Sequence, residues 1–459
     1  MKIVLANPPV VYSNSATPKN DFRFREFVIS RKLWRLKGFP RFYHFMNHCF
    51  GPGKGVRYGV RAGSRWPFTL GAPTEYAPYP FIMGYTAAVL AERGFDVELM
   101  DAVACGEVNY RRFLERIRRA RPDIVLLECS TPTIVIDLWF AQKVADFAEV
   151  ALAGPHLVHD AEKTAFENRH IKYFLKGEYI LSALRMMEKR TGGIYDSEIV
   201  KDLDDIPFAY RNFEESLLYY DPSMPTPRPQ LQIYASKGCP FKCTYCLWPH
   251  TMYRGNVALR SPDKVAEEIR LCVEKQNYRS IFFDDDTFNL GDDRISALCD
   301  HLKRIGLPWT MMGRLDCSPL WLFDKMIDCG CVGMRFGIET FDAEVSRKIK
   351  KGLKAEDVKS VLRYLCNTYP RLMLHVTMMK NLPGQTRAIH ERDMEILSDM
   401  GFSLTNPYRS YQLSSCVPFP GTALYADIVK RYGMEGLSDH KMYDGSQEGF
   451  NQMMERLYD

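Results

Sequence analysis

The sequence of 459 residues predicts an α/β protein in two parts, a doubly wound domain followed by a partial (β/α)6 barrel. Two stretches of alternating apolar strands and helices, separated by a Pro-rich segment, lead to this prediction. Such alternation implies parallel sheets covered by helices, whose ligands bind beyond the carboxyl ends of the strands. The expected boundaries are 1–190 for the first domain, 191–230 for a linker, 231–425 for the barrel and 426–459 for a C-terminal tail.

The first part opens with an apolar strand at 2–7, and the alternation resumes after an insertion at 12–79. An apolar helix at 80–93 stops at Gly94, a residue type that commonly ends helices. Further strands are expected at 96–100, 123–127, 150–153 and 171–175, with helices at about 107–119, 134–147, 160–168 and 178–190.

The insertion carries a strong positive charge. Residues 19–65 hold twelve Lys and Arg against Asp21 and Glu26, whereas the net charge of the whole chain is only +5. Aromatic residues such as Phe22, Trp34 and Tyr43 are interleaved with the basic ones. A patch of this kind can contact RNA, an anionic membrane surface or a negatively charged ligand, or it can be a solvated face. No RNA-binding motif accompanies it, so nucleic acid is not the expected partner.

The second part begins at Leu231, after a segment with Pro222, Pro225, Pro227 and Pro229 that reads as a boundary. Strands are expected at 231–236, 280–284, 308–312, 332–337, 372–378 and 407–413, and helices near 262–275, 292–305, 319–328, 355–368 and 386–400. Six such units predict an open or partial barrel with function on the loops at the carboxyl ends of its strands.

The most informative feature is a cysteine triplet, Cys239, Cys243 and Cys246, with the spacing C-x3-C-x2-C after the first strand of the second part. Thiolates are soft ligands that select iron–sulfur clusters, zinc or copper(I). Three thiolates would leave one iron of a cubane cluster open to a substrate or cofactor. The alternative is a structural zinc site, which wants four ligands and for which His250 is the nearest fourth candidate.

The other ten of the 13 cysteines are scattered along the chain and read mostly as core thiols. The amino-terminal stretch breaks at Pro8-Pro9 before a signal-peptide core can form, and no run approaches the roughly 18 apolar residues of a membrane span. We therefore expect a reducing, cytoplasmic location in which cysteines serve metal binding rather than disulfides.

Residues 231–425 resemble the core of the radical SAM enzymes, whose open iron binds S-adenosylmethionine (SAM). The resemblance is carried by the cysteine triplet and by Phe282-Phe-Asp-Asp-Asp-Thr-Phe-Asn289, Met334-Arg-Phe-Gly-Ile-Glu-Thr340, Asn381-Leu-Pro-Gly-Gln-Thr386 and Pro418-Phe-Pro-Gly-Thr-Ala-Leu-Tyr425. It implies that Cys239, Cys243 and Cys246 hold a [4Fe–4S] cluster.

The same resemblance implies the SAM contacts. Tyr245 would meet the adenine, Asp284 and Asp285 the amine, and Glu339 other polar groups of SAM. Arg314 could pair with the SAM carboxylate through a bidentate fork, or equally form a structural salt bridge. The acidic run could be only a turn or a helix cap, and Glu339 a satisfied acid at a strand end. No catalytic residue is assigned.

The first part resembles the Rossmann-like domain of the cobalamin-dependent radical SAM enzymes. Its matching strand-end segments would lie against the corrin ring, with the expected contacts Ser130, Thr131, Gly154, Pro155, His156, Gly177 and Glu178. Val103 replaces the histidine of the D-x-H-x-x-G motif of lower-ligand cobalamin proteins, so cobalt would lack that imidazole. A core or loop role for His156, and a first domain without cobalamin, are the alternatives.

The resemblance implies a cobalamin-dependent radical SAM methyltransferase. A 5′-deoxyadenosyl radical would abstract hydrogen from an unactivated carbon, and methylcobalamin would supply the methyl group. The substrate would be a small molecule, a lipid or a peptide. The electron would come from an external donor of the flavodoxin or ferredoxin type. Radical cyclisation or rearrangement with cobalamin, and tRNA modification without it, remain the alternatives.

Overall fold

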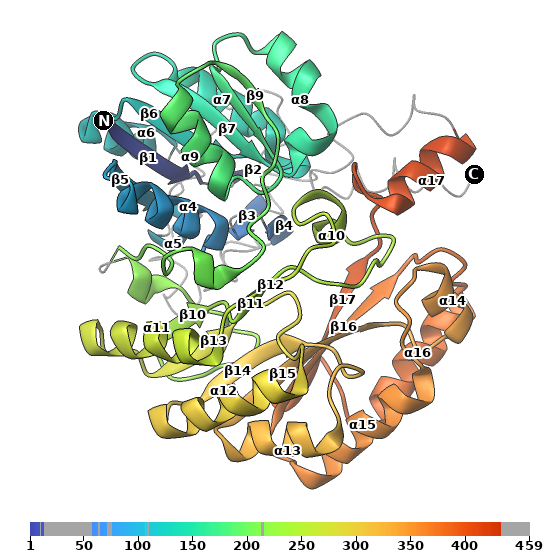
Figure 1. Ribbon diagram of the computed structural model, residues 1–459. Coiled ribbons are helices and arrows are strands. Elements are labelled where there is room, and N and C mark those ends of the chain that lie inside the picture. Colours follow the sequence, from blue (N-terminus) through green and yellow to red (C-terminus); the bar gives the residue numbers. More distant parts are fainter. Residues whose placement is uncertain are drawn as a thin grey trace, which may run out of the picture. The chain divides into compact units, whose positions relative to one another are not determined.

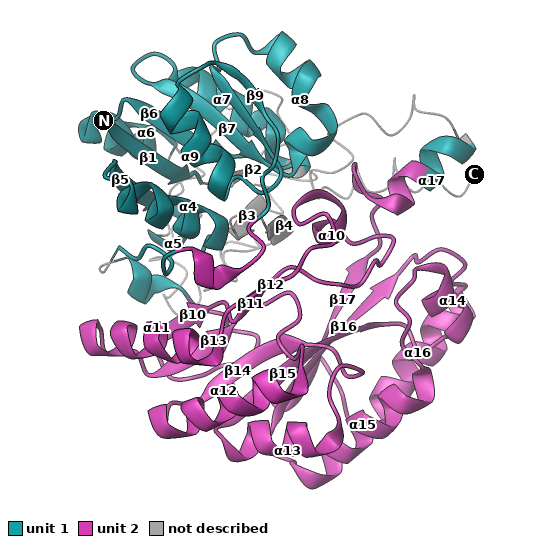
Figure 2. Cartoon of the chain, in the orientation of Figure 1, with its two compact units in different colours: residues 1–199, 207–219, 427–459 teal, residues 200–206, 220–426 magenta. Residues whose placement is uncertain are grey.

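The structure, a computed structural model, describes residues 1–9, 11–12, 57–62, 65–70, 76–105, 107, 110–212 and 215–432. Most of the predicted basic insertion 12–79 and most of the tail 426–459 lie outside these residues. Two compact units form the chain (Figure 2), the first comprising Met1–Ile199, Pro207–Tyr219 and Asp427–Asp459, the second Val200–Ile206 and Tyr220–Ala426.

The first unit is built on a parallel six-stranded sheet of order β5-β1-β6-β7-β8-β9 (Figure 1). Its strands are β1 (Lys2–Asn7), β5 (Asp96–Asp101), β6 (Ile124–Glu128), β7 (Glu149–Gly154), β8 (Tyr173–Lys176) and β9 (Gly193–Tyr195). A separate antiparallel sheet contains β2 (Val11–Tyr12), β3 (Arg57–Ala62) and β4 (Arg65–Leu70). The central strands are buried on both faces, as the apolar runs at 2–7 and 124–128 predict.

Helices cover both faces of the first sheet. They are α4 (Phe81–Glu92), α5 (Ala102–Cys105), α6 (Tyr110–Ala120), α7 (Ile134–Val144), α8 (His156–Glu167) and α9 (Ile180–Lys189). Side chains of α6, α7 and α8 share one apolar core with the sheet, and α4 packs beside α9. Helix α6 shows why: its buried residues Tyr110, Phe113 and Ile117 recur at the helical period.

The second unit contains another parallel sheet, of order β10-β13-β14-β15-β16-β17. The strands are β10 (Gln230–Ile233), β13 (Ser280–Phe283), β14 (Trp309–Gly313), β15 (Cys331–Glu339), β16 (Met373–Lys380) and β17 (Arg409–Ser415). A short antiparallel ribbon of β11 (Ser236–Lys237) and β12 (Ala258–Leu259) lies apart from this sheet. The strand expected at 231–236 is therefore two strands, β10 and β11, because the chain leaves the sheet after Ile233.

Helices follow the strands of the second unit and share one large core with them. They are α10 (Trp248–Thr251), α11 (Pro262–Lys275), α12 (Asp292–Ile305), α13 (Leu320–Asp328), α14 (Ala343–Lys348), α15 (Ala355–Thr368), α16 (Arg387–Asp399) and α17 (Ala423–Tyr432). Alternation along β15 buries Met334, Phe336 and Ile338 in that core, so Arg335 and Gly337 point to the opposite face of the sheet.

Residues 191–230 form more than a connector. Strand β9 joins the edge of the first sheet, residues 200–206 belong to the second unit, and 207–219 return to the first. Short 3-10 helices occur at Thr131–Thr133, Leu203–Asp205 and Ser216–Leu218. The sequence analysis places 191–230 in a linker, so the three-residue strand β9 was not expected.

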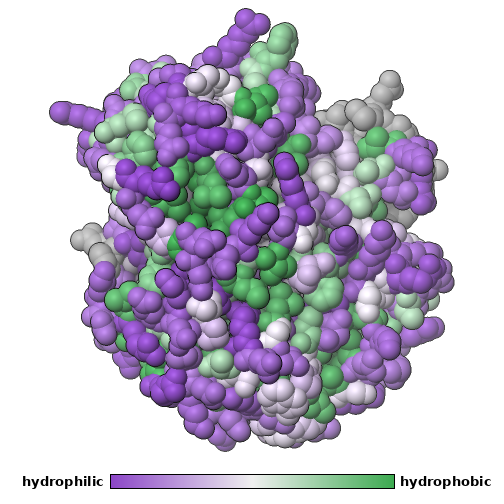
Figure 3. All heavy atoms as spheres, viewed as in Figure 1, coloured by the Kyte–Doolittle hydropathy of each residue, from purple (hydrophilic) through white to green (hydrophobic). Residues whose placement is uncertain are grey.

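The surface mixes polar and apolar side chains. Hydrophilic residues predominate over the face shown in Figure 3, with hydrophobic residues gathered in smaller patches. Among the described residues, no helix combines the length and the apolar character needed to span a bilayer.

Candidate functional site

The cysteine triplet lies on the loop between β11 and α10, directly after the first strand of the second sheet. Cys243 is buried, and Cys239 and Cys246 are half-buried. The loop enters its turn at Gly238, whose φ is +91°; a Cβ there would lie 2.2 Å from the Asn256 carbonyl oxygen. Only glycine fits this close approach. The Cys246 N–H donates to the Cys243 carbonyl and closes the turn between these two thiols.

The acidic run after β13 anchors this loop. The Ser236 hydroxyl and the Ala235 N–H donate to Asp285 at 2.6 and 3.2 Å, and the Gly238 N–H donates to Asp286 at 2.9 Å. Asp284 and Asp285 are fully buried, and burial raises the pKa of Asp285 to about 6. The Asp285 carboxylate thus holds the strand that leads into the cysteines, and its contact with the SAM amine stays a prediction.

The three thiols form a donor set that fits a cluster. Burial raises the pKa of Cys246, and the neighbouring Cys243 and Cys239 thiols raise it further. Burial likewise raises the pKa of Cys239, whose sulfur lies 3.4 Å from the Thr287 hydroxyl. Buried thiols with raised pKa values stay protonated until a bound metal stabilises the thiolate form. Within the described chain, no three His, Cys, Asp or Glu side chains are gathered for a single metal ion, whereas iron–sulfur clusters are ordinarily held by cysteine thiolates.

His250, the fourth ligand of the zinc alternative, faces the backbone. Its Nε2 lies 3.2 Å from the Cys243 carbonyl oxygen. With the proton on Nε2 the ring donates to this oxygen, which takes that nitrogen away from a metal.

Glu339 ends β15 beside the cysteine loop. Its Oε1 accepts from Lys351 Nζ at 3.1 Å and from Thr377 at 3.5 Å, and Glu339 has a φ of +71°, rare for a residue with a side chain. Burial raises the pKa of Tyr245 well above its usual range, and the nearby Glu339 carboxylate adds to this rise. Tyr245 and Glu339, both predicted SAM contacts, are thus neighbours. Lys351 was not found in the sequence because no motif marks it.

Arg314 is held by its own loop. Its guanidinium makes a two-pronged contact with Asp316, at 2.9 and 2.7 Å, and lies 3.6 Å from the centre of the Phe241 ring in the cysteine loop. The alternative of a structural salt bridge is therefore what this structure shows. A SAM carboxylate would have to compete with Asp316 for the Arg314 guanidinium.

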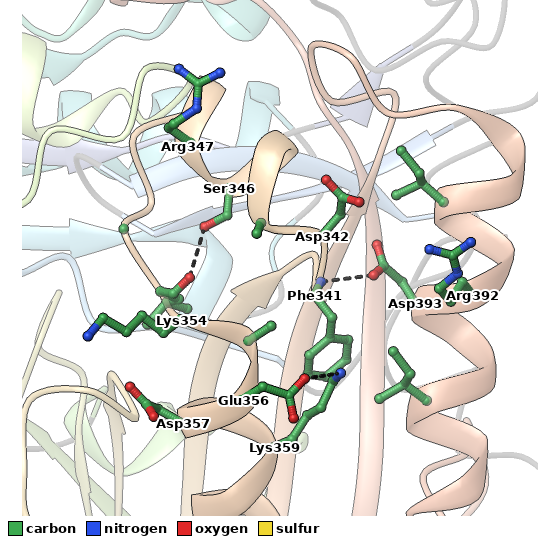
Figure 4. Close-up of a pocket in the computed structure, with 16 residues that line it drawn as sticks. Phe341, Asp342, Ser346, Arg347, Lys354, Glu356, Asp357, Lys359, Arg392 and Asp393 are labelled. Atoms are coloured by element: carbon green, nitrogen blue, oxygen red, sulfur yellow. Dashed lines mark hydrogen bonds and ion pairs between the residues drawn. The ribbon is translucent and has the colours of Figure 1, made fainter.

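A cavity of about 730 Å³ lies between α14, α15 and α16. None of the predicted site residues lines it. Asp393, on its wall, accepts from the Phe341 N–H at 2.8 Å (Figure 4). It also accepts from the Thr340 hydroxyl at 2.7 Å. Asp393 thereby fixes the two residues that follow Glu339.

The first unit gathers the other predicted residues at the carboxyl edge of its sheet. Strands β1 and β6 are neighbours although β5 lies between them in sequence, so connections leave β1 and β6 in opposite directions. This reversal is the point where open parallel sheets bind ligands. Ser130 and Thr131 follow β6, Gly154 to His156 end β7, and Gly177 and Glu178 follow β8.

These strand-end residues contact one another. Thr131 Oγ1 lies 3.2 Å from His156 Nδ1, and Ser130 Oγ lies 2.9 Å from Thr133 Oγ1. Gly154 has a φ of +123°, and a Cβ there would meet the Cys129 carbonyl oxygen at 2.6 Å. His156 is buried at the start of α8, whose expected beginning at 160 is corrected to 156.

Asp101, at the end of β5, belongs to this edge as well. It accepts from the Val103 and Ala104 N–H groups, from Asn7 Nδ2 at 2.9 Å and from the Tyr219 hydroxyl at 3.1 Å. Asp101, which matches the aspartate of the D-x-H-x-x-G motif, therefore caps the short helix α5. Val103, at the position of the motif's histidine, is buried in the core. Tyr219 was missed in the sequence, because it lies 118 residues from Asp101.

Residues 233–397 match the model of the radical SAM superfamily. The chain is 24% identical over 376 residues to an uncharacterized methyltransferase of Pyrococcus horikoshii, covering 75% of this chain and 77% of that protein. It is 24% identical over 426 residues to the cytidylyl-2-hydroxyethylphosphonate methyltransferase of Streptomyces wedmorensis, covering 77% and 78% of the two chains.

Solved structures share the fold. The radical SAM methyltransferase TsrM of Kitasatospora setae, with cobalamin and a [4Fe–4S] cluster bound, superposes with a TM-score of 0.60 at 16% identity over 78% of this chain and 73% of that one. The cobalamin-dependent SAM radical enzyme OxsB, with aqua-cobalamin and SAM bound, gives 0.52 at 15% identity over 70% and 50%. With a radical SAM domain at 233–397 and methyltransferase relatives along most of its length, the chain is a radical SAM enzyme homologous to methyltransferases.

Proposed function

We propose that this protein methylates an unactivated carbon with a [4Fe–4S] cluster, SAM and cobalamin. The observation that carries the proposal is the loop of Cys239, Cys243 and Cys246, which the Asp285 and Asp286 carboxylates and a glycine turn hold at the carboxyl end of a parallel sheet. When bound, these cofactors would supply the electron, the radical and the methyl group. An external donor of the flavodoxin or ferredoxin type would provide the electron.

The residues of the second unit would bind and orient. The three thiolates would hold the cluster, and the iron without a protein ligand would be open to SAM. Tyr245 and Glu339, which are neighbours, would contact the adenine and a polar group of SAM. Arg314 would keep the cysteine loop in place through its stacking on Phe241, and its contact with SAM would require opening of the Asp316 pair.

The first unit would bind cobalamin as a Rossmann-like domain. Its expected contacts, Ser130, Thr131, Gly154, Pro155, His156, Gly177 and Glu178, all stand at the carboxyl edge of the sheet, whose strand order reverses between β1 and β6. Gly154 would keep the carboxyl end of β7 in place at this edge, because a Cβ at this position would collide with the Cys129 carbonyl oxygen. With Val103 in the core, no imidazole from that position would reach cobalt.

The first experiment measures iron and cobalt in protein reconstituted without oxygen alongside hydroxocobalamin. About four irons for a cubane cluster and one cobalt per chain support the proposal. Iron without cobalt would remove cobalamin and return tRNA modification to consideration. A protein that contains neither iron nor cobalt after reconstitution would overturn the proposal.

Cysteine variants assign the cluster. Alanine at Cys239, Cys243 or Cys246 should each abolish most iron binding, whereas Cys272→Ala, at a half-buried thiol on α11 of the same unit, should leave it unchanged. With both cofactors loaded, analysis of products separates methylation from cyclisation or rearrangement, because only methylation adds a carbon from SAM.

A further inference from the structure

A basic segment joins α14 to α15. It is Arg347-Lys-Ile-Lys-Lys-Gly-Leu-Lys354, which contains five basic residues and no acidic one. Lys351 is buried and pairs with Glu339. The other four basic residues are exposed: Arg347, Lys348, Lys350 and Lys354. None of these four is an expected contact of the cluster, SAM or cobalamin, so the proposed cofactor sites do not use their charge.

The backbone of the basic segment is bonded to the cysteine loop. Thr244, the residue after Cys243, donates its N–H to the Ile349 carbonyl at 2.9 Å. The Arg314 guanidinium donates to the Lys351 carbonyl at 3.0 Å. Ile349 and Lys351 are buried, and the four basic side chains around them are exposed. A molecule bound to the exposed side chains would therefore lie beside the loop that carries the three thiols.

Three of the four exposed charges are unpaired. Lys348 pairs with Glu344, one turn earlier on α14, at 3.0 Å. Arg347, Lys350 and Lys354 form no ion pair with any described residue. Exposed charges act on molecules in solution over a Debye length of about 10 Å at 0.1 M salt. The three side chains together would attract a negatively charged partner to the basic segment.

Apolar side chains lie next to two of these charges. Arg347 and Lys354 line the cavity between α14, α15 and α16, with their charged ends pointing away from Asp393 (Figure 4). Leu353 and Ile389 line the same cavity. Of its four acidic residues, three are bound within the unit and the fourth is Asp357: Asp342 caps α14, Asp393 accepts from Phe341, and Glu356 pairs with Lys359. An apolar centre with a charged rim is the usual composition of a protein–protein interface.

We propose that the basic segment, residues 347–354, docks an acidic electron-carrier protein, the external donor that the proposed function requires. The inference rests on the proposed function for the presence of a cluster in the neighbouring loop. In the step that docking serves, one electron leaves the reduced flavin or iron–sulfur centre of the carrier and enters the cluster, and no atom moves. Encounters between electron-transfer proteins bury less than about 1,200 Å², so a segment of this length is sufficient.

A single-stranded nucleic acid would need more than this charge. Proteins bind single strands by stacking the bases on aromatic side chains. Residues 342–360, which include the basic segment, contain no aromatic residue. The electron donor, in contrast, has to come close to the cluster, and the Thr244 bond places the basic segment against the cluster loop.

Binding measurements on the full chain test this surface. The probes are a purified acidic flavodoxin and a purified acidic ferredoxin, each passed over the immobilised protein with and without the reconstituted cluster. The triple variant Arg347→Glu/Lys350→Glu/Lys354→Glu should bind the carriers about tenfold more weakly than the wild type at low salt. Binding to the wild type should weaken as the salt concentration rises.

A second triple variant is the matched control. Lys303→Glu/Arg363→Glu/Arg371→Glu changes the net charge by the same amount at exposed positions that precede the amino ends of β14 and β16. It should bind the carriers as the wild type does. Reduction of the cluster by chemically reduced flavodoxin should be about tenfold slower in the first triple variant only, whereas dithionite, which needs no docking surface, should reduce all three proteins alike.

Three results would overturn the proposal. They are equal weakening of carrier binding in both triple variants, unchanged binding in the first triple variant, and no binding of either carrier to the wild type. Loss of binding to an RNA oligonucleotide in the first triple variant, with carrier binding unchanged, would assign the basic segment to nucleic acid instead. Carrier binding is also measured without the cluster, so its failure is distinguishable from a failure to bind iron and cobalt.

Discussion

Lys351 and Glu339 form a buried ion pair at the end of β15, with 3.1 Å between Nζ and Oε1 and less than a tenth of either side chain exposed. Glu339 reaches this position with a left-handed backbone, which places its carboxylate beside Tyr245. Gly337 makes room for the pair, because a Cβ there would lie 2.7 Å from Glu339 and 2.9 Å from Lys351. Gly337, Lys351 and Tyr245, which lie apart in the sequence, thus meet at the Glu339 carboxylate.

Removal of one partner of this pair should destabilise the second unit. Lys351→Ala leaves the Glu339 charge buried and unpaired, and we expect a loss of about 3–5 kcal/mol in the free energy of unfolding. The double variant Glu339→Gln/Lys351→Met has no buried charge and should recover most of that loss. Urea unfolding of the three proteins measures both effects. If the single variant unfolds like the wild type, the pair is solvated and does not hold the strand end.

Gly238→Ala should disturb the cysteine loop by collision. Both Gly238 and Gly255 have positive φ, but a Cβ at Gly238 would lie 2.2 Å from the Asn256 carbonyl oxygen, whereas nothing lies within 4 Å of one at Gly255. Gly255→Ala therefore carries only the backbone cost of roughly 1–2 kcal/mol. We expect a loss of most iron after reconstitution in Gly238→Ala and near-normal iron in Gly255→Ala. Equal iron contents would show that the close approach is not needed for the loop.

The same comparison tests the first unit. Gly154 and Gly193 both have positive φ, and a Cβ meets a backbone oxygen at 2.6 Å in the first case and no atom within 4 Å in the second. Gly154→Ala should weaken cobalamin binding, because the edge of β7 must shift to accept the methyl group. Gly193→Ala should bind cobalamin as the wild type does. The absorption of cobalamin that stays with the protein after gel filtration measures this binding. If both variants retain cobalamin, Gly154 does not contribute to cobalamin binding.

Local patterns account for the elements that the sequence predicted well. Helices α11, α12 and α15 have the expected bounds, because apolar residues recur at the helical period in each, and Pro262 opens α11 while Gly306 ends α12. The cysteine triplet was equally visible, since its chemistry lies in spacing alone. Strand β9 and helix α14 were not expected, because each is short and depends on the neighbours it packs against.

Long-range contacts account for what the sequence could not show. Lys351 and Tyr219 occupy the candidate sites through contacts 12 and 118 residues away, and nothing in the local sequence separates them from other lysines and tyrosines. Asp285 was expected at the cofactor for its position at a strand end, and the sequence did not show that its oxygens also accept from Ser236 and Ala235. Position at a strand end is a local property, and the direction of a carboxylate is a tertiary one.

Asp101 should make stability depend on pH. Burial raises the pKa of its carboxyl from 3.8 to about 6, so the folded state holds this proton more tightly than the unfolded chain does. The contribution of Asp101 to the free energy of unfolding is therefore greatest below pH 3.8 and falls as the pH rises through about 6, by up to about 3 kcal/mol.

Urea unfolding of the wild type and of Asp101→Asn between about pH 4 and pH 8 isolates this contribution, because asparagine does not titrate there. The difference between the two profiles should change with pH mainly from 4 to 6 and be flat above 7. Asp96→Asn, at the exposed start of the same strand, is the matched control and should follow the wild type. Parallel profiles for the wild type and Asp101→Asn would mean that water or the Tyr219 hydroxyl already stabilises the ionised carboxylate in the fold.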